Sequence, residues 1–169
     1  MKYNPDVHHR RSIRLKNYDY SQAGAYFITM CIQNRECLLG EIVDRNMHLS
    51  PVGENVLLQW TNLPQRFSGL ELDAFAVMPN HFHAIISINP VGQGAVLGAA
   101  SSAPTLGKIL RAFKSISAIE GNRLLNRSNR SFWQRNYWEH VIRNEKELVT
   151  LRQYILNNPA QWEFDSLYM

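Results

Sequence analysis

The chain has 169 residues, of which 45% are hydrophobic and 19% are charged. This composition is typical of one folded domain and excludes a disordered chain, and no apolar stretch approaches the ~20 residues that cross a bilayer. The formal net charge is +4, a mild cationic excess. The first twenty residues lack the apolar centre of a secretory signal, so we expect a cytoplasmic protein without membrane contact.

The N-terminal segment 1–20 is a basic arm. Its clustered cations are Arg10, Arg11, Arg14 and Lys16, beside His8 and His9. Clustered cations are typical of a polyanionic partner such as nucleic acid. Segment 24–33 (GAYFITMCIQ) follows, and its aromatic and β-branched residues predict a buried strand. Segment 35–43 is expected to extend it into a hairpin or to form a second short strand.

The middle of the chain predicts one helix and two strands. Segment 50–67 has apolar residues at helical spacing, with Ser50 at the position of an N-cap. Segments 70–79 and 81–89 have the composition of strands. They meet at Pro79-Asn80, a turn-forming pair, so we expect them to lie next to each other.

The C-terminal half begins with segment 90–104, which is rich in small residues and predicts a flexible loop. Segment 105–125 predicts an amphipathic helix, and the aromatic segment 131–142 predicts a strand. A last helix is expected to begin after Asn144, with Glu147 completing a capping box, and to stop at Pro159.

The order of these elements predicts the fold class. Without the last helix it is β-α-β-β-α-β, the ferredoxin-like split βαβ plan of an α+β protein. This plan has an antiparallel sheet with helices on one face, and the last helix is added to it. We expect a single domain over residues 1–169.

Two histidines, His81 and His83, lie two residues apart in a predicted strand, so their side chains leave the same face. Paired imidazoles are half of a divalent-metal site, although two unrelated histidines are the simpler interpretation of this pattern. Three kinds of third ligand are available. Cys31 would favour zinc, His140 is a second imidazole donor, and an oxygen would favour Mg²⁺ or Mn²⁺.

The last helix offers such an oxygen. Tyr154 and Asn158 are four residues apart and therefore share a helix face, beside the apolar residues that would dock the helix on the sheet. From the residues alone, a packing tyrosine and an ordinary helix-ending asparagine are the better explanation of the pair.

Longer motifs resemble one known family. "MPNHFH" resembles the histidine–hydrophobic–histidine motif of the HUH single-strand DNA endonucleases. "GAYFIT", "FWQRNYWEHVIRN" and "YILNNP" are similar to segments of the REP-associated tyrosine transposases, a branch of the single-tyrosine transposases. The resemblance covers roughly residues 8–162, in the same order and spacing.

The resemblance implies roles for individual residues. His81 and His83 would bind the catalytic metal, Mg²⁺ or Mn²⁺, and Tyr154 would be the nucleophile. Asn158 would be the third ligand, although some relatives have Gln there, which reaches further. Tyr137 is a rival nucleophile without the "YILNNP" context. Because neutral histidines are needed, we expect activity to fall below about pH 6.

The resemblance also implies the substrate, which would be single-stranded DNA beside a hairpin of a REP-like palindrome, nicked and rejoined through a 5′-phosphotyrosine. The arm, together with Arg111, Lys114 and Arg123, could bind phosphates. Unpaired bases could stack on Phe132, Trp133, Tyr137 and Trp138, although each is more often a core residue. Two alternatives stay open, namely a DNA-binding module without catalysis and a zinc hydrolase using Cys31. The chain could act as a monomer or as a homodimer.

Overall fold

The computed structural model describes residues 23–89 and 104–168. The basic arm at 1–20, including Arg10, Arg11, Arg14 and Lys16, lies outside the described residues, as does the predicted loop up to residue 103. Among the described residues, no helix is long and apolar enough to cross a membrane.

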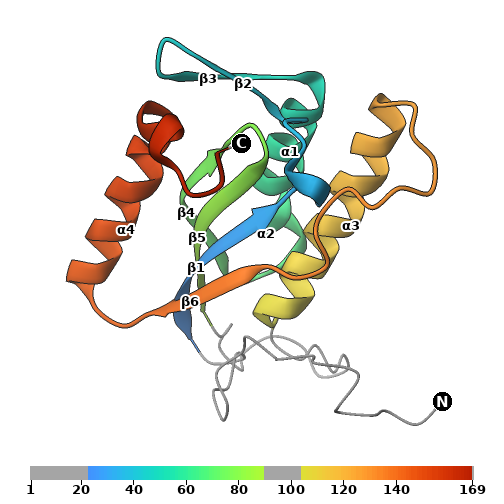
Figure 1. Cartoon of the computed structure of the whole chain (residues 1–169). Coiled ribbons are helices and arrows are strands. Elements are labelled where there is room, and N and C mark those ends of the chain that lie inside the picture. Colours follow the sequence, from blue (N-terminus) through green and yellow to red (C-terminus); the bar gives the residue numbers. More distant parts are fainter. Residues whose placement is uncertain (1–22, 90–103, 169) are drawn as a thin grey trace, which may run out of the picture.

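Four antiparallel strands form the central sheet, in the order β4-β5-β1-β6 (Figure 1). Their bounds are β1 Gly24–Cys31, β4 Leu70–Val77, β5 His81–Ile88 and β6 Trp138–Ile142. The strands β4 and β5 are joined at Pro79-Asn80, as the turn chemistry predicts. This order is that of the ferredoxin-like plan, so the predicted α+β fold class is confirmed.

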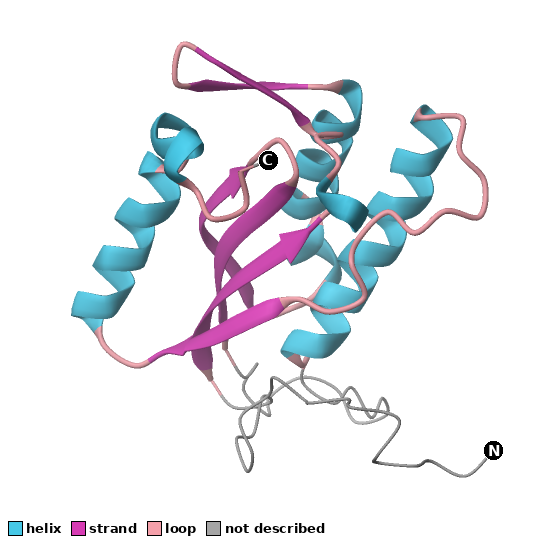
Figure 2. Cartoon of the chain, viewed as in Figure 1, coloured by secondary structure: helices cyan, strands magenta, loops and turns pink. Residues whose placement is uncertain are grey.

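Helices cover both faces of this sheet (Figure 2). On one face lie α1 (Pro51–Thr61), the short α2 (Leu63–Arg66) and α3 (Leu106–Leu124), over a large core that includes Trp60, Phe82 and Phe113. On the other face lies α4 (Glu145–Asn157), over a small cluster of Phe27, Ile85 and Ile155. Alternation along β5 therefore sends Phe82 into the large core and both histidines toward α4.

The helix predicted over 50–67 is interrupted. Ser50 caps α1 as expected, since its Oγ accepts from the N–H of Gly53 at 3.1 Å. The helix ends at Thr61 because Pro64 has no N–H to donate to the carbonyl of Trp60, and its ring clashes with that carbonyl. The chain then makes the short α2, in which Pro64 occupies the first turn.

The strand predicted over 131–142 begins only at Trp138. Phe132 and Trp133 are buried in the large core, and only an isolated bridge joins Trp133 to Ile32. Gly121 of α3 allows this packing, because a Cβ there would meet the Phe132 ring at 2.7 Å. The aromatic content of this segment thus reflects packing against α3 and not a longer strand.

A separate two-stranded hairpin contains β2 (Gly40–Val43) and β3 (Asn46–Leu49). Asp44 and Arg45 connect them with φ of 49° and 65°, the left-handed pair that tight hairpin turns require. The sequence indicates the strand near 43, whereas β3 is missed because it is short and half exposed. Two 3₁₀ turns, η1 (Gln33–Arg35) and η2 (Pro159–Phe164), complete the described structure.

Candidate active site

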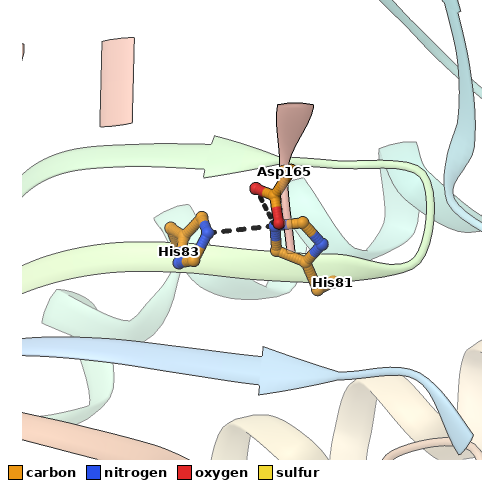
Figure 3. A group of neighbouring side chains, drawn as sticks. All are labelled: His81, His83 and Asp165. Atoms are coloured by element: carbon orange, nitrogen blue, oxygen red, sulfur yellow. Dashed lines mark hydrogen bonds and ion pairs between the residues drawn. The ribbon is translucent and has the colours of Figure 1, made fainter. Parts of the chain in front are cut away.

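The histidine pair lies at the start of β5, on the face that α4 covers. His81 is 0% exposed and His83 is 3% exposed. Their Nε2 atoms face each other at 3.0 Å (Figure 3). The strand spacing therefore brings the two imidazoles together, as predicted, and both rings are almost fully buried.

Hydrogen bonds on the far side of the rings determine which nitrogen of His81 is protonated. The amide nitrogen of Asn80 donates to the carbonyl of Leu167 at 2.8 Å, which leaves Asn80 Oδ1 toward His81 Nδ1, also at 2.8 Å. An amide oxygen only accepts, so His81 Nδ1 carries the proton and its Nε2 presents a lone pair. This is the tautomer that a metal-binding imidazole needs.

Thr29 on β1 pairs with His83 in the sheet register, and its Oγ1 lies 2.8 Å from His83 Nδ1. The hydroxyl can donate to this nitrogen or accept from it. If it accepts, both Nε2 atoms present lone pairs toward each other, an arrangement that a cation between them stabilises. If it donates, His83 Nε2–H can donate to His81, which satisfies the pair without a cation.

Asp165, directly after η2, supplies a carboxylate to the same place. Its Oδ2 lies 3.8 Å from His81 Nε2, and its side chain is only 3% exposed (Figure 3). Asn158 Nδ2 and the N–H of Leu167 donate to this carboxylate at 3.1 and 2.7 Å. No Lys or Arg of the described residues pairs with it, so a buried negative charge is left without a cation.

Asn158 and Tyr154 face the cluster from α4 and its C-terminal end. Asn158 is 3% exposed, and its Oδ1 is buried with no hydrogen-bond partner among the described residues. Tyr154 is 43% exposed, and its hydroxyl lies 3.5 Å from His83 Nε2. The predicted tyrosine, asparagine and histidines therefore meet at one point, although their roles stay a prediction.

Electrostatics keep the two imidazoles of this cluster neutral. Burial, with a smaller effect of the Arg35 charge, lowers the pKa of His81 to about 3. Burial and then the neighbouring His81 lower the pKa of His83 to about 3, while Asp165 acts in the opposite direction. Burial and then the Asp165 charge raise the pKa of Tyr154, and the neighbouring Asn158 side chain offsets this only in part, so the phenol is neutral near pH 7.

The donor set fits a divalent metal ion. His81, His83 and Asp165 each offer one ligand atom, and these atoms lie within 4.8 Å of one another. The unpartnered Oδ1 of Asn158 is a second oxygen donor beside them. Mixed imidazole and oxygen ligands suit Mn²⁺ and related first-row ions better than Mg²⁺, which prefers oxygen throughout.

The helix α4 is fixed to the sheet of its own chain. Ile155 is fully buried against Phe27 and Ile85, and Leu148 and Leu151 pack beside it. Arg152 makes a two-pronged contact with Asp73 of β4, with Nε–Oδ1 at 2.8 Å and Nη2–Oδ2 at 2.6 Å. These contacts hold Tyr154 within reach of the histidines.

The alternative ligands and the rival nucleophile do not join the group of His81, His83 and Asp165, although Cys31 is the cross-strand partner of His81. Cys31 is not part of the cluster that could bind a metal among the described residues. His140 on β6 instead contacts Glu147 at 2.6 Å, at the start of α4. Tyr137 lines the pocket beside the site, but the phenol recorded near His83 is that of Tyr154.

The predicted phosphate-binding residues are not brought together with the histidines. Arg111, Lys114 and Arg123 all belong to α3, on the opposite face of the sheet. Lys114 Nζ donates to the carbonyls of Gln134 and Arg135 at 2.6 and 3.2 Å, and burial lowers its pKa. Arg123 pairs with Glu120 at 2.8 Å. Their contact with DNA stays a prediction.

Asp165 is the residue that sequence reasoning missed. It lies eleven positions after Tyr154, but Glu163 is the first carboxylate after α4, so position alone does not single out Asp165. A lone aspartate near a C-terminus has no motif, so only the structure joins it to the histidines.

Comparisons with known proteins agree with this fold and site. No protein-family model matches the chain. An uncharacterized protein of Haemophilus influenzae is 42% identical over 178 aligned positions, covering 99% of this chain and 98% of that protein. A second Haemophilus influenzae protein, assigned as a REP-associated tyrosine transposase, is 24% identical and covers 87% of this chain and 77% of its own length.

Two solved structures share the architecture. One is a REP-associated tyrosine transposase bound to a REP hairpin, with a TM-score of 0.61, 20% identity, and coverage of 90% of this chain and 76% of that one. The other, from Deinococcus radiodurans and described as a transposase, has a TM-score of 0.50 and 19% identity, covering 85% and 95%.

The fold of this chain, in which a helix brings Tyr154 to the paired histidines of the sheet, is thus similar to the fold of solved transposases. In sequence, the chain is similar to an assigned REP-associated tyrosine transposase, in agreement with the resemblance of its motifs to that family.

Proposed function

We propose that this protein is a metal-dependent enzyme that nicks and rejoins single-stranded DNA beside a REP-like hairpin, through a 5′-phosphotyrosine. The observation that carries the proposal is the position of the Tyr154 hydroxyl, 3.5 Å from His83 Nε2 in a cluster with His81 and Asp165. The solved relative that is bound to a REP hairpin supports the choice of substrate.

His81, His83 and Asp165 would hold the metal, Mg²⁺ or Mn²⁺, with Asn158 as the predicted further ligand. A divalent cation bound there would offset the charge of a non-bridging phosphate oxygen and of the buried carboxylate. Asn80 fixes the His81 tautomer that keeps the Nε2 lone pair available.

Tyr154 would supply the nucleophile. Its oxygen forms a bond to phosphorus while the bond from phosphorus to the 3′ oxygen breaks, and a proton passes from the phenol to the departing 3′-OH by way of solvent or a nearby base. Burial and then the Asp165 charge raise the pKa of this phenol, so offsetting the Asp165 charge removes one of the two effects that oppose attack. Attack of a second 3′-OH on the phosphotyrosine reverses these bond changes and joins strands.

The phosphate contacts of the proposal come from the basic arm (Arg10, Arg11, Arg14 and Lys16) and from Arg111, Lys114 and Arg123 on α3. If several of them neutralise phosphates, affinity should weaken steeply with salt. The two alternative functions make different predictions for the same assay. A DNA-binding module would bind without cutting, and a zinc hydrolase would cut without a covalent intermediate.

The test is incubation with hairpin-bearing single-stranded oligonucleotides and Mn²⁺ or Mg²⁺, followed by a denaturing gel. We expect a covalent protein–DNA adduct that disappears with EDTA and in Tyr154→Phe. Tyr137→Phe, which removes the rival hydroxyl, is the matched control and should keep the adduct. An adduct that persists in Tyr154→Phe would refute the assignment.

A further inference from the structure

A pocket of about 650 Å³ opens directly beside the candidate active site. Its wall includes His83 and Tyr154, and it continues past Phe27 to Trp138 on β6. Pockets of this size hold a small organic group rather than a phosphate alone. A group bound here would therefore adjoin the residues proposed to act on phosphorus.

Trp138 is exposed to water and yet held in one orientation. Its side chain is 51% exposed. One contact is the His140 ring, stacked at 5.9 Å between centroids with planes 7° apart, and another is Phe27, edge-on at 5.6 Å. An indole that is fixed before binding loses little entropy when it makes a contact. Such rigid exposed aromatic faces stack well on unpaired bases.

The remaining wall has the chemistry of base recognition. Tyr137 and Leu151 add apolar surface, while Gln134 and Asn136 add amide groups. Amides can both donate to and accept from the edge of a base. Arg35, also in the wall, adds a cation that suits a phosphodiester.

We propose that this pocket, with Trp138 as its stacking surface, binds one unpaired nucleobase next to the phosphate that Tyr154 attacks. This inference rests on the proposed function. It specifies which part of the DNA the protein binds beside the cleaved bond. Of the four aromatic residues that the sequence suggests for stacking, Phe132 and Trp133 are 3% and 5% exposed and belong to the core. Trp138 is the one with an exposed ring in the pocket wall.

The test measures binding, so that it does not depend on catalysis. In the Tyr154→Phe background with EDTA present, hairpin oligonucleotides that carry an abasic site at each unpaired position in turn are titrated by fluorescence anisotropy. We expect one position at which loss of the base weakens binding about 5- to 100-fold. At that position, Trp138→Ala should weaken binding to intact DNA by a similar factor and should cause no further loss with the abasic DNA.

Conservative variants separate stacking from structure. Trp138→Phe should keep most of the affinity, whereas Trp138→Leu, which keeps apolar bulk without an aromatic face, should lose it; this pair also serves if Trp138→Ala does not fold. Phe164→Ala is the matched control, because Phe164 is 88% exposed and lies outside the pocket wall. It should bind as the background protein does.

The outcomes distinguish this inference from the function on which it rests. If the loss of affinity from Trp138→Ala multiplies with the loss from the abasic site at every position, the two are independent. That result would overturn the proposed base pocket, even if the Tyr154 adduct forms. Coupling at one position without any adduct would support the pocket and reject the proposed chemistry. No binding to any hairpin oligonucleotide would reject both.

Discussion

Acidification is expected to destabilise the metal-free protein through its two buried histidines. The pKa of His81 and of His83 is lowered to about 3 in the folded chain, against about 6.5 in an unfolded chain. Between these values the unfolded state takes up protons that the folded state refuses. Stability is therefore fully present above about pH 6.5 and is lost progressively as the pH falls toward 3.

The magnitude follows from the same values. From pH 7.5 to pH 5, each histidine should reduce the free energy of unfolding by about 2 kcal/mol, or about 4 kcal/mol for the pair. This is a large share of the ~5–15 kcal/mol typical of a domain. Urea denaturation with EDTA present, followed by tryptophan fluorescence at several pH values, measures it.

Single variants test the source of this pH dependence. His83→Gln should reduce it by about half, whereas His48→Gln should leave it unchanged, because His48 is exposed on β3 in the folded chain. A free energy of unfolding that stays constant or rises toward pH 5 would refute the reasoning. It would mean that the folded pair takes up an additional proton between its two Nε2 atoms, which lie 3.0 Å apart. If stability declines as described, the fall in activity expected below about pH 6 would result from loss of stability. Protonation of the histidines in the folded protein would occur only at lower pH.

Three further predictions concern the surroundings of the site. Asn80→Ala removes the acceptor of His81 Nδ1 and should weaken Mn²⁺ binding about 10- to 100-fold in calorimetric titration, done at a temperature where melting in EDTA shows the variant still folded. Asp165→Ala removes a charged donor and should abolish most of the Mn²⁺-induced rise in melting temperature; an undiminished rise would exclude it as a ligand. Asp73→Ala breaks the contact with Arg152, and because that pair is exposed to water, urea denaturation should show only a small loss of stability. The yield of the covalent adduct should fall more strongly, because α4 loosens.

Much of the fold could be predicted because its signals are local. The cap at Ser50, the turn before His81 and the capping asparagine Asn144 each act within a few residues, and each begins an element where predicted. The errors come from contacts distant in sequence. The segment around Phe132 has the composition of a strand because it packs against α3, which no local pattern reveals.

The candidate site divides in the same way. Strand alternation pairs His81 with His83, and helical spacing puts Tyr154 and Asn158 on one face, so these four could be found from spacing and from the family motifs. Asp165 could not be found, because its approach to His81 depends on how the 3₁₀ turn η2 folds back. The sequence gives no reason to prefer Trp138 among four aromatic residues, and only their exposure in the structure distinguishes it.

The docking of α4 on the sheet of its own polypeptide has a consequence for copies that are mixed. Ile155 and the Asp73–Arg152 contact keep the tyrosine with the histidines of the same chain. A variant that lacks the Tyr154 phenol and a variant that lacks one of the two imidazoles should then not restore activity when they are mixed.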